Sequence, residues 1–446
     1  MVLLYGLNNL IISSLYNKFL ELLNRTWFHI FLIFCVSFVT HFIYFGYPNS
    51  VVFDEVHIGR YITEYIKGAY VFDVHPPLGR LIFAGFAILF GADYITNFDN
   101  IGNILPNWAV LLRIIPILAG TILPIIIYLI LKNLDLSSKL ALLGAFLLCI
   151  ENSLIIHSRF LLTDSFLILF GFISILLYSY YRNKVKYFNF YLLFSIIFAS
   201  LAFSIKWTGL SFLFIIFALE FQNRKVKNYL KFAFSGLIIF FFVYSFVFSL
   251  NFVLLPNSGT GDPFMSSNFR EKNFWSKFSE LNIEMYRANT RLTKPHDYSS
   301  KWYSWPIMTR TVYYWNNDNT GSYLYLLGNP VIYYLGFASV LFLLIKRKLN
   351  NKSEYLVILG FLINFIPFIF IGRVMFLYHY QVALIFSVLA LVILLNRIQN
   401  QKVQNKMIIS LAILSFVFFI YFSPLTYGLP ISKDTLESMM WIKSWR

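Results

Sequence analysis

The apolar residues of this chain gather into long runs instead of repeating along one face of a helix. Such runs occupy residues 27–44, 109–131, 160–181, 232–255 and 376–395. A helix needs about 20 apolar residues to cross a bilayer, and most of these runs reach that length. A core helix of a soluble protein would show a polar face at 3.6-residue spacing, and these runs show none. The pattern predicts an all-α polytopic membrane protein.

Eleven segments are predicted to span the membrane. The run at 81–90 is too short to cross, so we predict an interfacial or re-entrant helix there. The connections are short except for two polar segments, 48–108 and 256–325, and the tail from residue 424. The predicted spans are 28–47, 109–131, 139–157, 160–181, 189–205, 208–221, 232–255, 326–345, 354–372, 374–395 and 407–423.

The charge distribution sets the predicted orientation. The chain carries a net charge of +16, yet only 13% of its residues are charged, well below the ~25% of soluble domains. A basic balance of this size also suggests a nucleic-acid partner, but the short connections on one side hold 18 Lys and Arg against four acids. That bias marks the cytoplasmic side. We therefore expect a cytoplasmic N-terminus, an outer C-terminus and no nucleic-acid partner. The basic residues are Lys18, Arg25, Lys132, Lys139, Arg182, Lys184, Lys186, Arg224, Lys225, Lys227, Lys231, Lys346, Arg347, Lys348, Lys352, Arg397, Lys402 and Lys406.

The cysteines do not suggest a disulfide framework, and the N-terminus does not suggest a cleaved signal peptide. Cys35 and Cys149 both lie inside apolar runs, which predicts small buried hydrophobic side chains and no disulfide or Cys-based metal site. The first 26 residues lack a signal-peptide cleavage pattern, so the first apolar run is predicted to remain as a helix.

Function is expected on the outer side, because long loops in a compact protein are usually functional. Residues 274–285 alternate aromatic and charged residues, which fits either an interfacial helix or ordinary loop packing. Asp54 and Glu55 follow the first span directly. Acids at a span mouth face water or a partner, so this pair forms either a solvated turn or a site. Further polar residues at or near outer span ends are Glu151, Asp164, Trp207 and His379, and His75 lies within the first long outer loop before two prolines.

Four cations also stand at predicted outer helix ends, each on a different helix: Arg113, Arg159, Lys206 and Arg373. They either extend separately to the headgroups or face a shared cavity and pair with anions. Acids and cations at one membrane depth favour a site for a phosphate-bearing lipid beside a general base.

Ordered motifs across nearly the whole chain resemble those of the protein O-mannosyltransferases, and the first three together look like that family's first lumenal loop. The motifs are Val52-Phe53-Asp54-Glu55-Val56-His57, Tyr65-Ile66-Lys67-Gly68, Asp73-Val74-His75-Pro76-Pro77-Leu78, Glu151-Asn152-Ser153, Ser158-Arg159-Phe160-Leu161-Leu162-Thr163-Asp164, Lys206-Trp207-Thr208-Gly209, Ser304-Trp305-Pro306, Leu327-Gly328-Asn329-Pro330, Phe376-Leu377-Tyr378-His379-Tyr380 and Pro424-Leu425-Thr426-Tyr427-Gly428.

This resemblance implies a membrane glycosyltransferase of the GT-C fold that moves mannose from a polyprenyl (dolichyl) phosphate to Ser or Thr hydroxyls of proteins outside the cytoplasm. Eukaryotic members carry a β-trefoil MIR domain in the second long loop, and residues 256–325 are too few for it. We therefore expect a compact prokaryotic-like member, with a single membrane domain over 1–446, in a cell membrane. For a eukaryotic source, we expect the endoplasmic-reticulum membrane as the location instead. Secreted or membrane proteins would be the acceptors, with export machinery as a further partner.

The residue roles follow from that chemistry. Asp54 is the predicted general base, as the resemblance also implies, and Glu55 would position the acceptor or orient Asp54. Arg113 and Arg373 are the first candidates for the lipid phosphate, because a guanidinium binds oxyanions with two hydrogen bonds. Lys206, Arg159 and His379 are secondary donor-site candidates. His75, Asp164, Glu151 and Trp207 would contact sugar or acceptor, or be structural.

We expect no cofactor or metal, since no close ligand spacing argues for one. Two other functions compete with this interpretation. The nearer is another GT-C transferase that uses a different polyprenyl-phosphate sugar or a lipid acceptor. The second is a transporter or channel, which charged residues at membrane depth also mark. The two halves of the chain show no similarity, and the polar residues cluster at the outer surface, unlike a midplane transport site.

Overall fold

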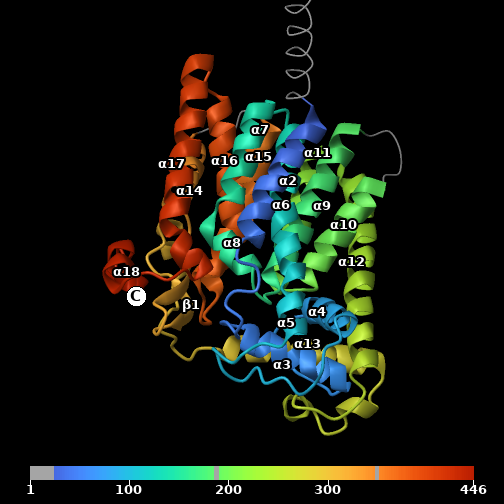
Figure 1. Ribbon diagram of the computed structural model, residues 1–446. Coiled ribbons are helices and arrows are strands. Elements are labelled where there is room, and N and C mark those ends of the chain that lie inside the picture. Colours follow the sequence, from blue (N-terminus) through green and yellow to red (C-terminus); the bar gives the residue numbers. More distant parts are fainter. Residues whose placement is uncertain (1–24, 185–189, 347–350) are drawn as a thin grey trace, which may run out of the picture.

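The computed structural model of the chain describes residues 25–184, 190–346 and 351–446, and most of them form one helical bundle (Figure 1). The predicted cytoplasmic residues Lys18, Lys186, Arg347 and Lys348 lie outside the described residues, as do most of the first 26 positions. The bundle helices are α2 (Thr26–Phe42), α6 (Ile114–Asn133), α7 (Ser138–Cys149), α8 (Asn152–Ser158), α9 (Asp164–Lys184), α10 (Phe190–Phe203), α11 (Leu210–Asn223), α12 (Val226–Leu254), α14 (Pro330–Ile345), α15 (Lys352–Phe365), α16 (Gln381–Asn396) and α17 (Gln401–Tyr427).

Every predicted span overlaps a bundle helix, but six helices in the described part of the chain are long and apolar enough to cross a membrane. A seventh results if α7 and α8, which meet at a bend of 56°, form one broken span. The remaining predicted spans coincide with shorter helices, so the count of eleven stays a prediction. The six are Asn107–Asn133, Asp164–Arg182, Val226–Leu254, Lys352–Phe370, Leu377–Asn396 and Gln401–Tyr427.

The break between α7 and α8 has a local cause at Glu151, which is fully buried. Its carboxylate caps α8 by accepting hydrogen bonds from the Leu154 amide at 2.7 Å and the Ser153 hydroxyl at 2.6 Å. It also accepts from the amide of Asn329, just before α14, at 2.9 Å. A side chain that caps a new helix satisfies amides that a continuous helix would bond internally. Glu151 therefore redirects the chain and fixes α14 beside α8.

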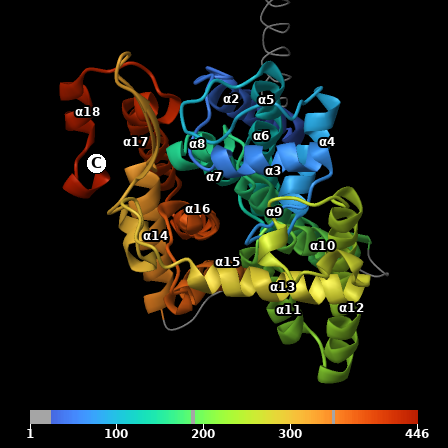
Figure 2. The same ribbon diagram turned by 90° about the horizontal axis from the view of Figure 1, so that it is seen from below.

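A second layer lies across one end of the bundle (Figure 2). It is built by the two long polar segments and the C-terminal tail, which the sequence predicts to share the outer side. The run predicted at 81–90 is part of a helix in this layer. The layer contains α3 (Glu55–Lys67), α4 (Leu78–Leu89), α5 (Asn107–Leu112), α13 (Phe274–Arg291), α18 (Lys433–Met439) and the antiparallel strands β1 (Val312–Asn317) and β2 (Ser322–Leu326).

The β1–β2 hairpin was not expected from the sequence. Its register pairs Val312 with Leu326 and Trp315 with Leu324, and the ladder is irregular between Tyr313 and Trp315. An irregularity of this kind leaves one residue unpaired and turns its side chain. That residue is Tyr314, which is fully buried and points toward α8, where it bonds His157.

Helix α13 contains residues 274–285, for which the sequence left two predictions open, an interfacial helix or ordinary loop packing. The helix shows features of both. Leu281 and Met285 are buried, and Phe278 packs against Tyr244 and Phe248 of α12. Trp275 on the same helix is 54% exposed and stacks beside an exposed phenylalanine of α12. One face of α13 therefore packs on the protein and the other is free. Its depth in a bilayer stays a prediction.

Candidate active site

The turn that presents Asp54 is held in an unusual backbone conformation. Phe53, just before it, has φ of +47°, in the left-handed region that a bulky residue rarely adopts. The Phe53 ring stacks on the Tyr314 ring at a centroid distance of 4.4 Å, and its amide donates to the Tyr314 carbonyl at 3.1 Å. Such backbone strain, of order 1–3 kcal/mol, persists only where the surroundings enforce it and is frequent at active sites. Strand β1 therefore fixes the point where Asp54 begins α3.

The Asp54 carboxyl is partly buried, and it remains available to accept a proton. Within residues 25–184, 190–346 and 351–446 its carboxylate has no hydrogen bond or ion pair. Burial raises the pKa of Asp54 above its usual value, while the nearby His57, Lys206 and His157 favour the charged form. An accessible carboxylate with a raised pKa suits a general base.

Glu55 has the opposite environment, although it is the next residue. It is fully buried, and both of its oxygens accept hydrogen bonds from Arg113, at 2.8 and 2.6 Å. The amides of Val52 and Leu161 donate to the same carboxylate, each at 2.9 Å. A carboxylate with four donors and no exposed surface cannot receive an acceptor, so of its two predicted roles this geometry supports only the orientation of Asp54.

The geometry argues against Arg113 as a phosphate ligand. Its side chain is 1% exposed, and it also donates to the carbonyls of Pro48 and Ser50, at 2.6 and 2.7 Å. All three guanidinium nitrogens are thus engaged inside the protein. Arg113 neutralises Glu55 and ties the first outer segment to the start of α6.

Arg159 is likewise engaged elsewhere. Its guanidinium donates to three backbone carbonyls at the end of α2, those of His41, Ile43 and Tyr44, at 2.6–2.8 Å. It also stacks on the Tyr427 ring at 4.9 Å. Carbonyls at the C-terminal end of a helix lack partners within the helix, and a cation there is stabilising. The geometry therefore favours structural roles for Arg159 and the helix-capping Glu151 over the predicted donor and acceptor roles.

The remaining candidates do come together, around a cavity of about 660 Å³ between α9, α11, α13, α15 and the start of α16. No single stretch of sequence builds it, since its lining runs from the first outer segment to the C-terminal helices. Its polar and aromatic lining includes His75, Asp164, Lys206, Trp207, Arg373, Tyr378 and His379.

Lys206 is aimed by Asp164, which begins α9. The Lys206 ammonium donates to both carboxylate oxygens, at 2.8 and 2.6 Å, and both side chains are mostly but not fully buried. The ammonium also lies over the Tyr378 ring at 5.5 Å. A paired ammonium that still lines a cavity retains a donor for a further anion. Asp164 thus acts here as the partner of a cation.

Arg373 and His379 line the same cavity. The Arg373 guanidinium donates to the Asn289 side chain of α13 and, at 3.4 Å, to the Val374 carbonyl. His379 contacts the Phe376 backbone through Nδ1 and stacks against Tyr378 and Trp305. Arg373 keeps one nitrogen, Nη2, without a protein partner among the described residues, so it has capacity for an oxyanion.

His75 and Trp207 border the cavity from two further elements. Burial, together with the Lys206 and Arg373 charges, holds the pKa of His75 well below its usual value, so its ring is neutral near pH 7. The Trp207 indole donates to the Tyr244 hydroxyl of α12 at 3.1 Å. His75 can therefore act as donor or acceptor toward a sugar hydroxyl, whereas Trp207 mainly fixes the wall.

Two functional candidates were missed in the sequence: His157 and Tyr314. His157 on α8 contacts the Tyr314 hydroxyl through Nδ1 at 2.5 Å and Asp164 through Nε2 at 3.3 Å. Its ring also stacks on Tyr378 at 5.2 Å. The chain Tyr314–His157–Asp164–Lys206 thus connects the support of Asp54 to the donor cavity. A lone histidine in an apolar run and a tyrosine in an unpredicted strand give no sequence signal for this link.

One wall of the cavity is apolar. Its residues include Leu167, Phe214 and Ile363, with Phe370 at the edge, and Phe214 and Phe370 are 56% and 84% exposed. Exposed aromatic side chains on membrane helices face lipid at low cost. The cavity therefore combines cations inside with an apolar opening, the arrangement that a phosphate on a long hydrocarbon chain requires.

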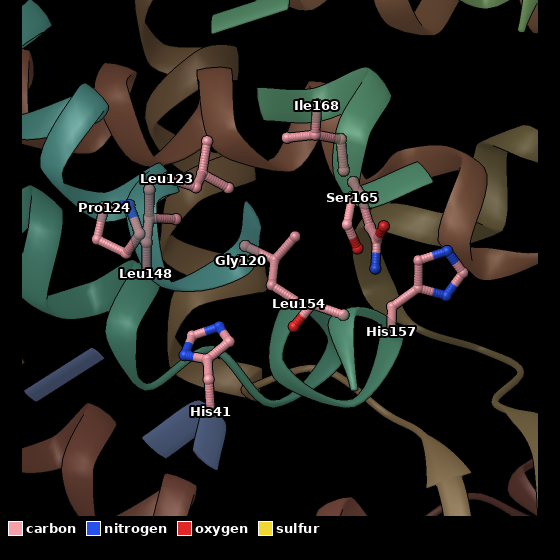
Figure 3. Close-up of a pocket in the computed structure, with 11 residues that line it drawn as sticks. His41, Gly120, Leu123, Pro124, Leu148, Leu154, His157, Ser165 and Ile168 are labelled. Atoms are coloured by element: carbon pink, nitrogen blue, oxygen red, sulfur yellow. The ribbon is translucent and has the colours of Figure 1, made fainter. Parts of the chain in front are cut away.

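A second, much smaller cavity lies deeper in the bundle (Figure 3). Its volume of about 20 Å³ is enough for roughly one water molecule. Its lining is mostly aliphatic, with His41 and His157 as the ring side chains. Ile168 and Gln381 belong to the linings of both cavities, so the small one lies next to the donor cavity. It is too small for a substrate.

A metal centre has no evident place in the described part of the chain, where no three His, Cys, Asp or Glu side chains are grouped to hold an ion. The groups that the structure brings near one another are the Asp54 carboxyl, the cations Lys206 and Arg373, and the aromatic and histidine side chains of the cavity.

Two consecutive parts of the chain match described protein families. Residues 31–264 match dolichyl-phosphate-mannose-protein mannosyltransferase, and residues 274–445 match the C-terminal four TMM region of protein-O-mannosyltransferase. Dolichyl-phosphate-mannose–protein mannosyltransferase 1 of Saccharomyces cerevisiae is 34% identical over 245 residues, which cover 50% of this chain and 30% of that protein. Protein O-mannosyl-transferase 1 of Mus musculus is 31% identical over 249 residues, which cover 50% and 33%. The chain thus spans about a third of the length of these relatives.

Solved structures share the fold. A chain of the S. cerevisiae protein O-mannosyltransferase Pmt1-Pmt2 complex bound to the sugar donor gives a TM-score of 0.86 at 19% identity, covering 94% of this chain and 92% of that one. The Archaeoglobus fulgidus oligosaccharyltransferase tethered with an acceptor peptide gives 0.52 at 14% identity, covering 93% and 57%. These likenesses confirm the predicted GT-C fold. Because the first family match alone covers half of the sequence, the chain belongs to the dolichyl-phosphate-mannose-protein mannosyltransferase family.

Proposed function

We propose that this protein transfers mannose from a polyprenyl (dolichyl) phosphate to Ser or Thr hydroxyls of proteins. The observation that carries the proposal is the pairing of one accessible carboxylate, Asp54, with a cavity that holds Lys206 and Arg373 and opens through an apolar wall. The mannosyltransferase names of the relatives support the choice of donor and acceptor.

The reaction is a single displacement. Asp54 takes the proton of the acceptor hydroxyl as that oxygen attacks the anomeric carbon of mannose, and the bond between that carbon and the phosphate oxygen breaks. The lipid phosphate leaves with the bonding electron pair, and no general acid is needed because it is already stable as an anion. Attack from the face opposite the phosphate inverts the anomeric centre, as in other single displacements at sugars.

Lys206 and Arg373 hold the phosphate, and Asp164 keeps the Lys206 ammonium in place through two hydrogen bonds. These cations stabilise the charge that builds on the leaving oxygen, which is the largest electrostatic demand of the step. His379 and His75 line the same cavity and are placed to bond the sugar or phosphate. The apolar wall accommodates the first units of the polyprenyl chain.

We further propose that the site lies outside the cytoplasm, in the cell membrane of a prokaryote or the endoplasmic-reticulum membrane of a eukaryote. The excess of Lys and Arg in the short connections supports this orientation. Acceptors would then be secreted or membrane proteins that meet the enzyme during export. Blocking export of a substrate tests this, because modification that persists in the cytoplasm would contradict it.

The test is an assay of the purified protein in detergent or lipid with polyprenyl-phosphate mannose and a Ser/Thr peptide. We expect mannosylated peptide and free polyprenyl phosphate in equal amounts. Parallel reactions with polyprenyl-phosphate glucose and with a lipid acceptor test the competing function. Transfer of another sugar, or transfer only to the lipid, would replace the proposal with that alternative.

A further inference from the structure

A second large cavity adjoins the catalytic turn on the outer layer and is not used by the mechanism above. It has a volume of about 550 Å³ and lies between α3, the segment 94–99 and the start of the second outer segment. Its lining includes Arg60, Tyr61, Glu64, Tyr94, Thr96 and Phe264. It shares no residue with the lining of the donor cavity.

Asp54 does not itself line this cavity, but it lies on the face of α3 that does. Asp54, His57, Tyr61 and Glu64 follow at intervals of three or four residues, so their side chains lie on the same face. The last three of them line the cavity. Burial raises the pKa of the Tyr61 phenol, and the Asp73 and Asp54 charges raise it further, whereas the Arg80 charge lowers it. A ligand in this cavity therefore lies along the helix face that leads to the general base, and the donor cavity with Lys206 has a separate lining.

The walls of the cavity are packed and hold their shape without a ligand. The Arg80 guanidinium, 2% exposed, lies 5.3 Å from the centre of the Tyr61 ring and pairs with Asp73 at 3.6 Å. On the other wall, Phe72 and Phe264 stack at 4.5 Å with an angle of 14°. A preformed cavity lowers the ordering cost of binding.

The chemistry of the lining separates this cavity from the donor cavity. Its charges are balanced, since Arg60 lies 3.6 Å from Asp99 and Lys67 lies 3.3 Å from Glu64. The other polar groups are hydroxyls and amides of Thr63, Thr96, Asn97 and Thr260, set among aromatic rings. Such a surface has no free cation cluster for a phosphate. It suits an extended, uncharged peptide whose backbone and hydroxyls need hydrogen bonds and whose carbon atoms need aromatic contact.

We propose that this cavity, the α3 groove, binds the acceptor polypeptide and delivers its Ser or Thr hydroxyl to Asp54, while the lipid donor occupies the cavity around Lys206. The identity of the ligand as an acceptor rests on the proposed function. The location of polypeptide binding rests on the groove itself, so the two are tested separately.

The kinetic test uses two groove variants, each with a matched control. Tyr94→Ala and Arg60→Ala should each raise the KM for a Ser/Thr peptide roughly fivefold, as expected for one contact at a polar interface. The KM for the lipid donor and the kcat at saturating peptide should stay unchanged. Tyr94 is 61% exposed and Tyr303 is 60% exposed, so Tyr303→Ala is the tyrosine control.

The arginine control is Arg446→Ala. Arg60 and Arg446 each form an exposed ion pair, with side-chain exposures of 56% and 60% and distances of 3.6 and 3.9 Å. Both control variants should leave the peptide KM as it is. Equal effects of groove and control variants, or a change in donor KM alone, would overturn the assignment.

A binding test does not depend on sugar transfer. A Ser/Thr peptide carrying a benzophenone is irradiated with the Asp54→Asn protein, and the crosslinked residues are mapped by mass spectrometry. We expect crosslinks in 57–67 and 94–99. Crosslinks confined to the β1–β2 hairpin or to the donor cavity would refute the groove, even if the enzyme transfers mannose. Crosslinks in the groove without transfer by the unaltered enzyme would refute the proposed function and leave the groove in place.

Discussion

Replacement of Arg113 separates a structural role from a phosphate-binding role most clearly. In Arg113→Ala the Glu55 carboxylate, 0% exposed, loses two of its four donors and stays buried with its charge uncompensated. The carbonyls of Pro48 and Ser50 lose their donors as well. Removing one partner of a buried ion pair costs about 3–5 kcal/mol.

We therefore expect Arg113→Ala to unfold in detergent at a temperature several degrees lower than the unaltered protein. Since the side chain does not line the donor cavity, protein that remains folded should retain the donor KM. We expect kcat to fall, because Asp54 is no longer held in place. Thermal unfolding followed by intrinsic fluorescence, with donor titrations at low temperature, measures both effects.

A double-mutant cycle with Glu55→Gln sharpens the test. If the two side chains act mainly on each other, the double variant should be destabilised by clearly less than the sum of the single variants. Arg397→Ala, which removes one partner of Glu354 at the predicted cytoplasmic side, serves as a control that lowers stability without changing kcat. The reasoning is refuted if Arg113→Ala keeps its unfolding temperature and instead raises the donor KM.

Three further predictions concern the site itself. Lys206→Met and Arg373→Ala should each raise the donor KM roughly tenfold, the loss expected for a charge-assisted hydrogen bond, and unchanged donor titrations would exclude them as phosphate ligands. Since only ionised Asp54 accepts a proton and burial raises its pKa, kcat/KM should fall as pH drops through that pKa. The acid limb of a pH–rate profile should therefore lie above the pH of about 4 expected for a free aspartate; a limb at or below it would show that the carboxyl is solvated. His157→Phe keeps a ring against Tyr378 but loses the hydrogen bond to Tyr314 and the 3.3 Å contact with Asp164. We therefore expect kcat to fall about fivefold with a displaced acid limb, and an unaltered pH profile would assign His157 to packing alone.

The general architecture was predictable because the length and composition of an apolar run determine whether it can cross a bilayer. The positions of all eleven predicted helices and the grouping of the two long segments at one end follow from that pattern. The break at Glu151 did not follow from that pattern, because a carboxylate inside an apolar run does not indicate which amides donate to it. The β1–β2 hairpin did not follow from it either, because the hairpin is short and packs through contacts with distant segments.

The residue types of the candidate site could be predicted from the sequence. The partner that each charged side chain bonds was harder to predict. Sequence position places Arg113, Arg159 and Lys206 equally at outer helix ends, yet Arg113 bonds Glu55, Arg159 bonds the end of α2, and Lys206 lines the cavity. Which cation remains available for a ligand depends on acids and carbonyls 40 to 120 residues away. That information is present only in the folded chain.

The central claim, that Asp54 is the base for sugar transfer at this site, is tested most directly by the Asp54→Asn protein. We would measure mannosyl transfer to a Ser/Thr peptide and, on the same preparation, binding of polyprenyl-phosphate mannose. The variant keeps the shape of the side chain, which has no hydrogen-bond partner among the described residues. We predict that transfer is lost while donor binding and unfolding temperature remain. Near-full transfer by Asp54→Asn would contradict the account.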